Sequence, residues 1–318
     1  MIQGYLGIDV GSVSTKVVVI DQRGKVLASR YLRTNGRPID TLQQGMRLVG
    51  AEIGDRVEVK GSGATGSARH LAGLMIGADV VKNEITAHAV AASRAVEGVQ
   101  TIIEIGGQDS KIIIMRDGVV VDFGMNTVCA AGTGSFLDQQ ASRLQIPIED
   151  FGSYAIKANH PVRIAGRCAV FAESDMIHKQ QLGYSLEDIV AGLCEALVRN
   201  YLNNVGKGKE ILSPIIFQGG VAANLGLVRA FEAYLKTPVI VPQNYEVMGA
   251  IGVAILARDV VTKKGGANFK GFVVQDMAYK TTSFECKGCP NACEVVQFYQ
   301  ESEILARWGD RCGTWSGA

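Results

Sequence analysis

The sequence lacks two features that would place a protein in a membrane or on a nucleic acid. Although 47% of its 318 residues are hydrophobic, no apolar run approaches the roughly 20 residues needed to span a bilayer. Its 32 basic and 31 acidic residues leave a formal net charge of +1, which creates no strong field to attract DNA, RNA or an anionic membrane. We therefore expect neither a nucleic acid nor a membrane among its partners.

The sequence also lacks a secretory signal, because residues 1–4 lead into a strand-like segment without a basic, apolar and small-residue pattern. We expect a cytoplasmic protein, in which structural disulfides are disfavoured. The seven cysteines then need another role, either as buried apolar residues or as metal ligands. The chain is long enough for two modest domains around one cleft.

An internal repeat is the most informative feature present. Residues 8–20 (IDVGSVSTKVVVI) align without a gap with residues 103–115 (IEIGGQDSKIIIM), so that Asp9 matches Glu104. Each segment consists of an apolar strand, a turn of small residues and a second apolar strand, which predicts a buried hairpin. The spacing indicates two copies of one domain.

The turns of these hairpins carry residues suited to a polyphosphate. Glycine allows backbone N–H groups to approach an anion, and hydroxyl groups add donors. An acid at the strand end, Asp9, and Asp109 in the second turn can hold Mg²⁺, usually through water. One hairpin alone is as readily an ordinary tight turn, but the matched pair favours a phosphate clamp. The predicted phosphate-binding residues are Gly11, Ser12, Ser14, Thr15, Lys16, Gly106 and Gly107.

Two later segments extend the pattern. Residues 214–224 form a short apolar strand that runs into a Gly-Gly turn, and an amphipathic helix is predicted over residues 225–235. Small residues at this helix start would let a purine or ribose lie against the backbone. Residues 246–254 open another helix, rich in small residues. The predicted adenosine-binding residues are Gly219, Gly220, Ala222 and Asn224.

Over roughly residues 4–260, this order of motifs resembles the actin, Hsp70 and sugar-kinase ATPases. The resemblance implies an α/β fold with two ribonuclease H-like domains around a nucleotide cleft, which binds ATP or ADP with Mg²⁺. We expect the first domain at residues 1–98 and the second at 99–262, with its final helix packing back toward the first. A cysteine-containing C-terminal extension, residues 263–318, would begin with a Lys/Gly-rich linker.

Two cysteines, Cys129 and Cys168, each precede a helical pattern. A helix N-terminus stabilises a thiolate and favours an anionic cluster. Two cysteines do not complete a site in one chain, but two chains related by a two-fold axis supply the four that a [4Fe–4S] cluster needs. Spacing alone favours the simpler interpretation, in which both are buried apolar residues.

Resemblance reverses that preference. Residues 126–139 and 166–171, together with both hairpin turns, are similar to the activators of 2-hydroxyacyl-CoA dehydratases. They are equally similar to the benzoyl-CoA reductase ATPase subunits and to the reductases of double-cubane cluster proteins. This resemblance implies a homodimer that holds one [4Fe–4S] cluster between its subunits, with Cys129 and Cys168 of each as ligands. Within the same stretch we expect Gly132, Thr133 and Gly134 to belong to the nucleotide site.

The activity implied by this resemblance is low-potential electron transfer driven by ATP hydrolysis. A ferredoxin or flavodoxin would be the donor, and an iron–sulfur dehydratase, a benzoyl-CoA-type reductase or a double-cubane cluster protein the acceptor. Asp9 and Asp109 would position Mg²⁺, and either Gln108 or Asp109 would orient the attacking water.

Two other functions suit the same fold. The first is a sugar kinase with a structural zinc site and Glu104 or Asp109 as the base, although the sequence shows no sugar-contact motif. The second is a non-catalytic nucleotide switch.

The C-terminal extension carries its own cysteines. Cys286, Cys289 and Cys293 lie within eight residues around Gly and Pro, and Cys312 follows. Such a run typically binds an iron–sulfur centre or Zn²⁺, and the redox context slightly favours iron–sulfur. Cys194, in the middle of a helical pattern, is expected to be a core residue.

Overall fold

Two five-stranded sheets with the same strand order form the body of the protein, whose computed structural model describes residues 1–316. The first sheet has the order β3-β2-β1-β4-β5 and the second the order β10-β9-β6-β7-β8. Read from its other edge, the second sheet repeats the first strand for strand, as the internal repeat predicts. The strands are β1 (Ile2–Val10), β2 (Ser14–Asp21), β3 (Val26–Arg33), β4 (Val57–Thr65) and β5 (Val80–Val81), then β6 (Thr101–Ile105), β7 (Ser110–Arg116), β8 (Val119–Asn126), β9 (Ile215–Gln218) and β10 (Val239–Ile240).

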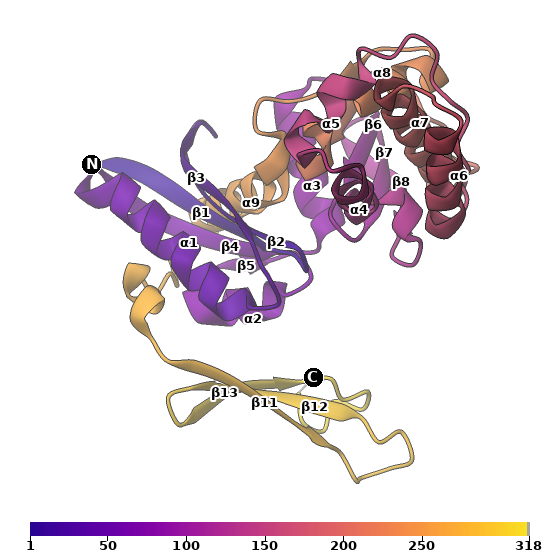
Figure 1. Cartoon of the computed structure of the whole chain (residues 1–318). Helices are drawn as coiled ribbons and strands as arrows, with labels where there is room; N and C mark the ends of the chain where they lie inside the picture. Colours follow the sequence, from indigo (N-terminus) through magenta and orange to yellow (C-terminus); the bar gives the residue numbers. More distant parts are fainter. Residues whose placement is uncertain (317–318) are drawn as a thin grey trace.

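The helices are distributed unequally between the two halves (Figure 1). The first half has α1 (Pro38–Ile53), η1 (Gly54–Arg56), α2 (Arg69–Ile76) and α3 (Glu84–Ala95). The second half inserts η2 (Ala130–Gly132), α4 (Gly134–Leu144), α5 (Ile148–Ala155), α6 (Ala169–Gln181) and α7 (Leu186–Asn204) between β8 and β9. It continues with η3 (Gly220–Ala223), α8 (Leu225–Leu235), η4 (Tyr245–Val247) and α9 (Met248–Lys264). Within residues 1–316, no helix is both long and apolar enough to cross a membrane.

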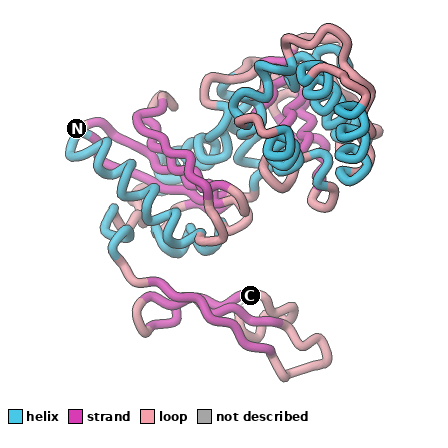
Figure 2. The backbone as a smooth tube through the Cα atoms, viewed as in Figure 1, coloured by secondary structure: helices cyan, strands magenta, loops and turns pink. Residues whose placement is uncertain are grey.

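Helix α9 follows the second sheet in sequence but packs on β1, β4 and α3 (Figure 2). The small residues expected at its start make this close packing feasible. A Cβ atom at Gly252 would lie 1.8 Å from the carbonyl oxygen of Ala87, and one at Gly7 would lie 1.9 Å from that of Ala250. Both positions therefore need glycine, because the backbones of neighbouring elements touch there.

The C-terminal extension starts later than the Lys/Gly-rich stretch indicates. Lys263 and Lys264 form the last turn of α9, and Gly265 caps that helix at a φ of 72°, since glycine adopts this left-handed conformation at little cost. The next element, η5 (Phe272–Asp276), docks on α1. There the side-chain amide of Gln43 donates to the backbone carbonyl of Val274, whose side chain is buried in the core of the first half. The chain is thus anchored once more before it leaves the body.

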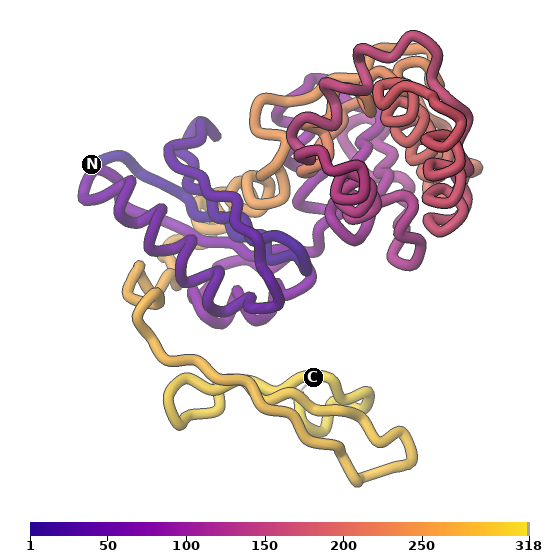
Figure 3. Tube along the Cα trace, in the orientation of Figure 1, coloured from indigo at the N-terminus to yellow at the C-terminus, as the bar shows by residue number. Residues whose placement is uncertain are grey.

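A small antiparallel sheet follows this anchor and hangs away from the body (Figure 3). Its strands are β11 (Tyr279–Glu285), β12 (Glu294–Gln300) and β13 (Glu303–Trp308), in that order. Tyr279 stacks on Phe298 with ring centroids 5.4 Å apart, and Trp308 lies beside the same ring.

Candidate functional site

The two repeat hairpins make the same turn. In the first, the N–H of Gly11 donates to the carbonyl of Ser14 over 2.9 Å; in the second, the N–H of Gly106 donates to the carbonyl of Asp109 over 3.0 Å. The turns of the two sheets face each other across one pocket. The equivalence read from the sequence is therefore also an equivalence of backbone geometry.

Asp9, the next-to-last residue of β1, pairs with Lys16 of β2, and the Lys16 Nζ lies 3.1 Å from a carboxylate oxygen. Burial raises the pKa of Asp9, but the attraction of Lys16 and His88 and the hydrogen bond from Lys16 outweigh it and hold the pKa below its usual value. Asp9 is therefore a charged carboxylate at the pocket between the two turns, as coordination of Mg²⁺ would require.

Lys111 occupies the equivalent position in the second half, but it contacts three carboxylates. Its Nζ lies 3.0 Å from Glu104, the match of Asp9, and also 2.8 Å from Glu84 and 2.7 Å from Asp109. Burial lowers the pKa of Lys111, but the attraction of the three carboxylates raises it by a larger amount. The pKa is therefore above its usual value, and the lysine stays charged. Burial, with repulsion from Asp109, raises the pKa of Glu104 despite Lys111.

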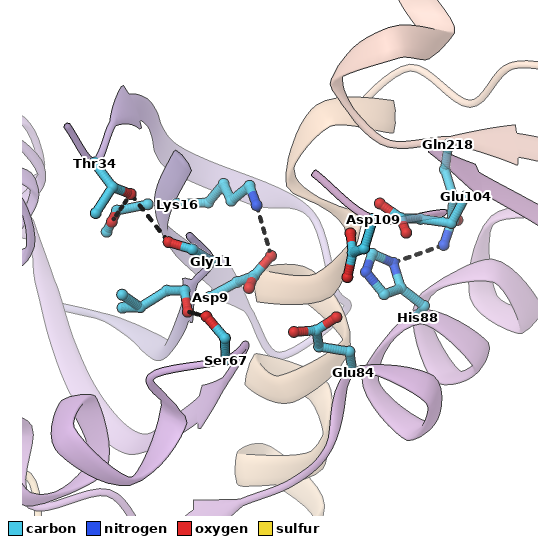
Figure 4. A network of polar contacts seen from close by, with 12 residues as sticks. Asp9, Gly11, Lys16, Thr34, Ser67, Glu84, His88, Glu104, Asp109 and Gln218 are labelled. Carbon is cyan, nitrogen blue, oxygen red and sulfur yellow. Dashed lines mark hydrogen bonds and ion pairs between the residues drawn. The ribbon is translucent and has the colours of Figure 1, made fainter. Parts of the chain in front are cut away.

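His88 of α3 lines the same pocket and faces Gln218 (Figure 4). Its Nδ1 is 2.7 Å from the amide nitrogen of Gln218 at the end of β9. Burial and the nearby positive charge of Lys111 lower the pKa of His88 to about 4, so the ring is neutral near pH 7. A neutral ring can accept the amide N–H at Nδ1, which leaves its own proton on Nε2.

A small pocket of about 60 Å³ lies between the turns, and a larger cleft of about 340 Å³ lies beside it. Gly106 and Gly107 line both spaces, so the two are adjacent. The residues predicted from the sequence that line the small pocket are Asp9, Gly11, Ser12, Ser14, Lys16, Gly106, Gly107, Gln108 and Asp109. Those lining the larger cleft include Gly134, Gly220 and Asn224. A polar pocket beside a roomier cleft suits a nucleoside polyphosphate.

Other predicted binding residues lie behind the walls of these spaces. The Thr15 side chain is fully buried, with its Oγ1 3.0 Å from that of Thr34. Thr133 caps α4, and its hydroxyl donates to the carbonyl of Ala130. Gly132 and Ala222 are buried. In the structure these residues shape the loops and do not line the cleft.

The structure contains a third matched turn that was not predicted from the sequence. Gly66 after β4 and Gly219 after β9 have φ values of 95° and 93°. A Cβ atom at Gly66 would lie 2.4 Å from the carbonyl of Val10, and one at Gly219 would lie 2.5 Å from that of Ile105. The next residue, Ser67, lines the phosphate pocket. A glycine directly after the equivalent strand of each half was the available signal.

Glu84 and His88 are two further pocket residues that were not predicted from the sequence. Both line the phosphate pocket. Asn83 caps the helix that carries them by accepting the backbone N–H of Thr86. Their importance arises from partners on distant strands, which local pattern does not show.

Cys129 and Cys168 come together at the surface of the second half. Cys129 is the N-cap of η2 and Cys168 is the N-cap of α6, so each precedes a helix as predicted. The Cys129 Sγ lies 3.9 Å from the carbonyl oxygen of Arg167, the residue before Cys168. Both cysteines are half-buried, so each remains partly accessible to a second protein at this surface.

Two asparagines hold these cysteines in place. The Asn126 side chain accepts the N–H of Cys129 over 2.9 Å and donates to its carbonyl over 2.8 Å. The Asn200 amide donates to the carbonyl of Gly166 over 2.6 Å and lies 3.6 Å from the Cys129 Sγ. Asn200 is buried, so it is a fixed link between the two cysteine loops.

The cysteine region is bonded directly to the second phosphate turn. The N–H groups of Gly134 and Ser135, at the start of α4, donate to the carbonyls of Gly106 and Gly107 over 2.9 and 2.8 Å. On the other side, the Tyr201 hydroxyl of α7 donates to the carbonyl of Lys111 over 2.7 Å. A shift of this turn would therefore displace the elements around the cysteines.

Exposed apolar side chains surround the two cysteines. Val128 is 95% exposed, and Val170 and Phe171 are 69% and 67% exposed. The outward face of the edge strand β8 adds Val119, Val121, Phe123 and Met125. A concentration of exposed apolar side chains in one region is typical of a protein–protein interface.

The remaining cysteines fall into two groups. Cys194 is buried in the core of the second half, and burial raises the pKa of its thiol, which confirms it as a core residue. Cys286, Cys289, Cys293 and Cys312 belong to the C-terminal extension. In the part of the chain that the structure describes, no three His, Cys, Asp or Glu side chains converge as a preformed metal site.

Comparison with known proteins gives consistent matches. Residues 6–257 match the BadF/BadG/BcrA/BcrD ATPase family. The chain is 31% identical over 255 residues to the 2-hydroxyisocaproyl-CoA dehydratase activator of Clostridioides difficile, covering 80% of this chain and 94% of that protein. It is 34% identical over 261 residues to the (R)-2-hydroxyglutaryl-CoA dehydratase activating ATPase of Acidaminococcus fermentans, covering 79% and 96%.

Solved structures of both activators match the fold. The Clostridium difficile activator with bound ADPNP aligns with a TM-score of 0.74 at 30% identity, covering 82% of this chain and 96% of that one. Component A of the Acidaminococcus fermentans dehydratase aligns with a TM-score of 0.76 at 30% identity, covering 81% and 99%. These matches confirm the predicted actin/Hsp70/sugar-kinase fold.

Proposed function

The chain belongs to the BadF/BadG/BcrA/BcrD ATPase family, and from this premise we propose that it is an ATP-driven electron-transfer activator of an iron–sulfur enzyme. It would take electrons from a ferredoxin or flavodoxin and pass them at low potential to its partner. The relatives named as dehydratase activators support a 2-hydroxyacyl-CoA dehydratase as the acceptor. A benzoyl-CoA-type reductase or a double-cubane cluster protein is an alternative acceptor, because each is also an iron–sulfur protein.

A bridging [4Fe–4S] cluster suits the two surface cysteines. Cys129 and Cys168 offer two soft thiolate ligands per chain from neighbouring helix starts, and a second copy would complete the set of four. The apolar rim formed by Val128, Val170 and Phe171 would be covered in a homodimer. When bound, the cluster would supply one-electron storage at low potential.

In the nucleotide site, Asp9 and Asp109 would position Mg²⁺, while Lys16 and the N–H groups of both turns would neutralise the phosphates. Gln108 is exposed at this pocket, whereas Asp109 is already paired with Lys111. This difference favours Gln108 as the residue that orients the attacking water.

The observation that carries the proposal is the direct bonding between nucleotide turn and cysteine region. Gly106 and Gly107 hold the start of α4 through Gly134 and Ser135. A γ-phosphate that pulls on this turn would therefore move the segment after Cys129. Each 59 mV of uphill one-electron transfer costs about 1.4 kcal/mol, and nucleotide-driven closure of a two-state cleft can supply several kcal/mol.

The decisive experiment is Cys168→Ser, with Cys194→Ser as the matched control. We expect the homodimer to hold iron in the control, with the EPR signal of a reduced [4Fe–4S] cluster. Cys168→Ser should lose that signal completely, since each substitution removes two of the four ligands from the dimer. It should also dimerise more weakly, deliver electrons at background level and retain ATP binding. An intact cluster signal in Cys168→Ser would refute the proposal.

A further inference from the structure

The three-stranded sheet of the C-terminal extension has very little core of its own. Among its described residues, Val295 and Phe298 are the fully buried apolar side chains of the strands. The family match ends at residue 257, so this sheet is additional to the shared ATPase fold. Domains below about 40 residues usually need a disulfide, a metal or a partner to be stable.

Strand pairing places two cysteines side by side at one end of this sheet. Glu285, the last residue of β11, pairs with Glu294, the first residue of β12. Cys286 and Cys293 form the next pair, and the N–H of Cys286 donates to the carbonyl of Cys293 over 2.8 Å. Residues directly opposite in an antiparallel pair have Cβ atoms about 4.5–5.5 Å apart on the same face.

Two further cysteines reach the same end of the sheet. Cys289 lies in the loop between this pair, where its carbonyl accepts the N–H of Ala292 over 3.2 Å. After β13, Gly309 passes so close to Glu294 that a Cβ atom would lie 2.4 Å from its carbonyl oxygen. Cys312 follows three residues later, so the chain returns it to the end of β12 that Cys293 precedes.

We propose that Cys286, Cys289, Cys293 and Cys312 bind one Zn²⁺ ion, which closes the end of the three-stranded sheet. Zinc–sulfur bonds of about 2.3 Å in a tetrahedron place thiolates roughly 3.8 Å apart. An adjacent cross-strand pair reaches that separation by side-chain rotation. A four-iron cluster bonds each thiolate to a different iron and spreads them more widely, which suits such a pair less well.

The surroundings of Cys286 support an anionic thiolate site. The indole N–H of Trp315 donates to the Cys286 Sγ over 3.3 Å. The Trp315 ring packs edge-on against Phe284, and the Arg307 guanidinium lies 5.4 Å from the ring centre. The hydrogen bond to sulfur stabilises the negative charge of a tetrathiolate site.

Metal binding would complete an arrangement that the strands prepare only in part. Cys289 and Cys312 are exposed, and within residues 1–316 the thiols do not already converge on one point. Their side chains can rotate inward because they lie on a loop and a terminal segment, outside the strands. Part of the zinc-binding free energy would then order the sheet.

The test measures zinc and iron per chain in the full-length protein after gel filtration in the presence of a mild chelator. We expect one zinc per chain in the wild type and in the Cys194→Ser control. Cys289→Ser should lose that zinc and keep its iron. Retention of zinc in Cys289→Ser, or loss of iron in place of zinc, would overturn the proposal.

Two further measurements guard against a variant that merely fails to fold. Wild-type protein loaded with Co²⁺ should show the visible bands of a tetrahedral cobalt–thiolate site, and their absence would contradict the proposal. A chain truncated after Ala278 should lose its zinc but bind ATP and dimerise, because it keeps Val274 and the η5 anchor on α1. Zinc retained by that truncated chain would also refute the site. Truncation after Lys264 is a poorer test, because it also removes Val274 from the core of the first half.

The zinc site and the proposed bridging cluster can fail independently. Cys168→Ser should lose iron and keep zinc, whereas Cys289→Ser should lose zinc and keep iron. A failure of one result therefore leaves the other proposal standing.

Discussion

The two halves of the body share one sheet topology and one turn geometry, yet they differ in what is inserted between the third and fourth strands. The first half connects these strands through residues 34–56, and the second uses residues 127–214. The longer insertion carries Cys129 and Cys168 and bonds to its own phosphate turn. The comparison teaches that each half contributes one turn to a single shared pocket, while the proposed redox function depends on one insertion.

The halves differ in charge as well. Lys16 forms an ion pair with Asp9, whereas the equivalent Lys111 contacts carboxylates from α3, β6 and the second turn. The first pair keeps a charged carboxylate at the pocket. Lys111 instead joins three separate elements of the structure. We infer that the first lysine serves mainly ligand binding and the second mainly the architecture of the cleft.

Lys111→Met is expected to cause the largest effect, because it would leave three carboxylates facing one another in a mostly buried site. Breaking a buried ion pair in this way typically costs about 3–5 kcal/mol. The matched variant Lys16→Met leaves only the Asp9 pair broken and should lose clearly less stability. Urea unfolding of both variants checks this, and equal losses would remove the distinction between the two lysines.

Protonation of His88 makes the stability of the folded protein depend on pH. Its pKa is about 4 in the folded protein, against the usual 6.5 of an exposed histidine, so the unfolded chain binds the proton more readily between these values. The stability from His88 is full above pH 6.5 and is lost as the pH falls toward 4, by up to about 3 kcal/mol. His88→Gln should flatten this part of the stability profile. The exposed His178→Gln serves as the control, and a profile that His88→Gln leaves unchanged would contradict the assignment.

Asp9→Ala should lower Mg²⁺-dependent ATPase activity at least tenfold, while the fold remains intact. A tenfold loss of rate corresponds to about 1.4 kcal/mol of transition-state stabilisation. The reason is that Asp9 is the charged carboxylate beside the pocket and buries little apolar surface. Steady-state hydrolysis at several Mg²⁺ concentrations measures the effect, with the exposed Asp55→Ala as the control. Wild-type turnover in a folded Asp9→Ala protein would show that this half does not position the metal.

Much of the nucleotide site could be predicted because its parts are local. The repeat of Asp9 through Lys16 as Glu104 through Lys111 contains a strand, a turn and a strand, and each hairpin pairs residues near in sequence. The third turn at Gly66 escaped notice because it lies on the next parallel strand, beyond the local pattern. Thr15 was misjudged as a lining residue because a strand alternates its side chains between two faces.

The sequence by itself determined the doubled fold, its turns and the helices that follow both surface cysteines, since periodicity, glycines and small residues act over short distances. Only the tertiary structure decided that Glu84 and His88 meet the distant residues Lys111 and Gln218, and that Cys129 lies beside the loop of Cys168. The physical reason is that charge pairing in a buried site depends on which elements pack together. That packing reflects the burial of apolar surface across the whole chain, which no single segment encodes.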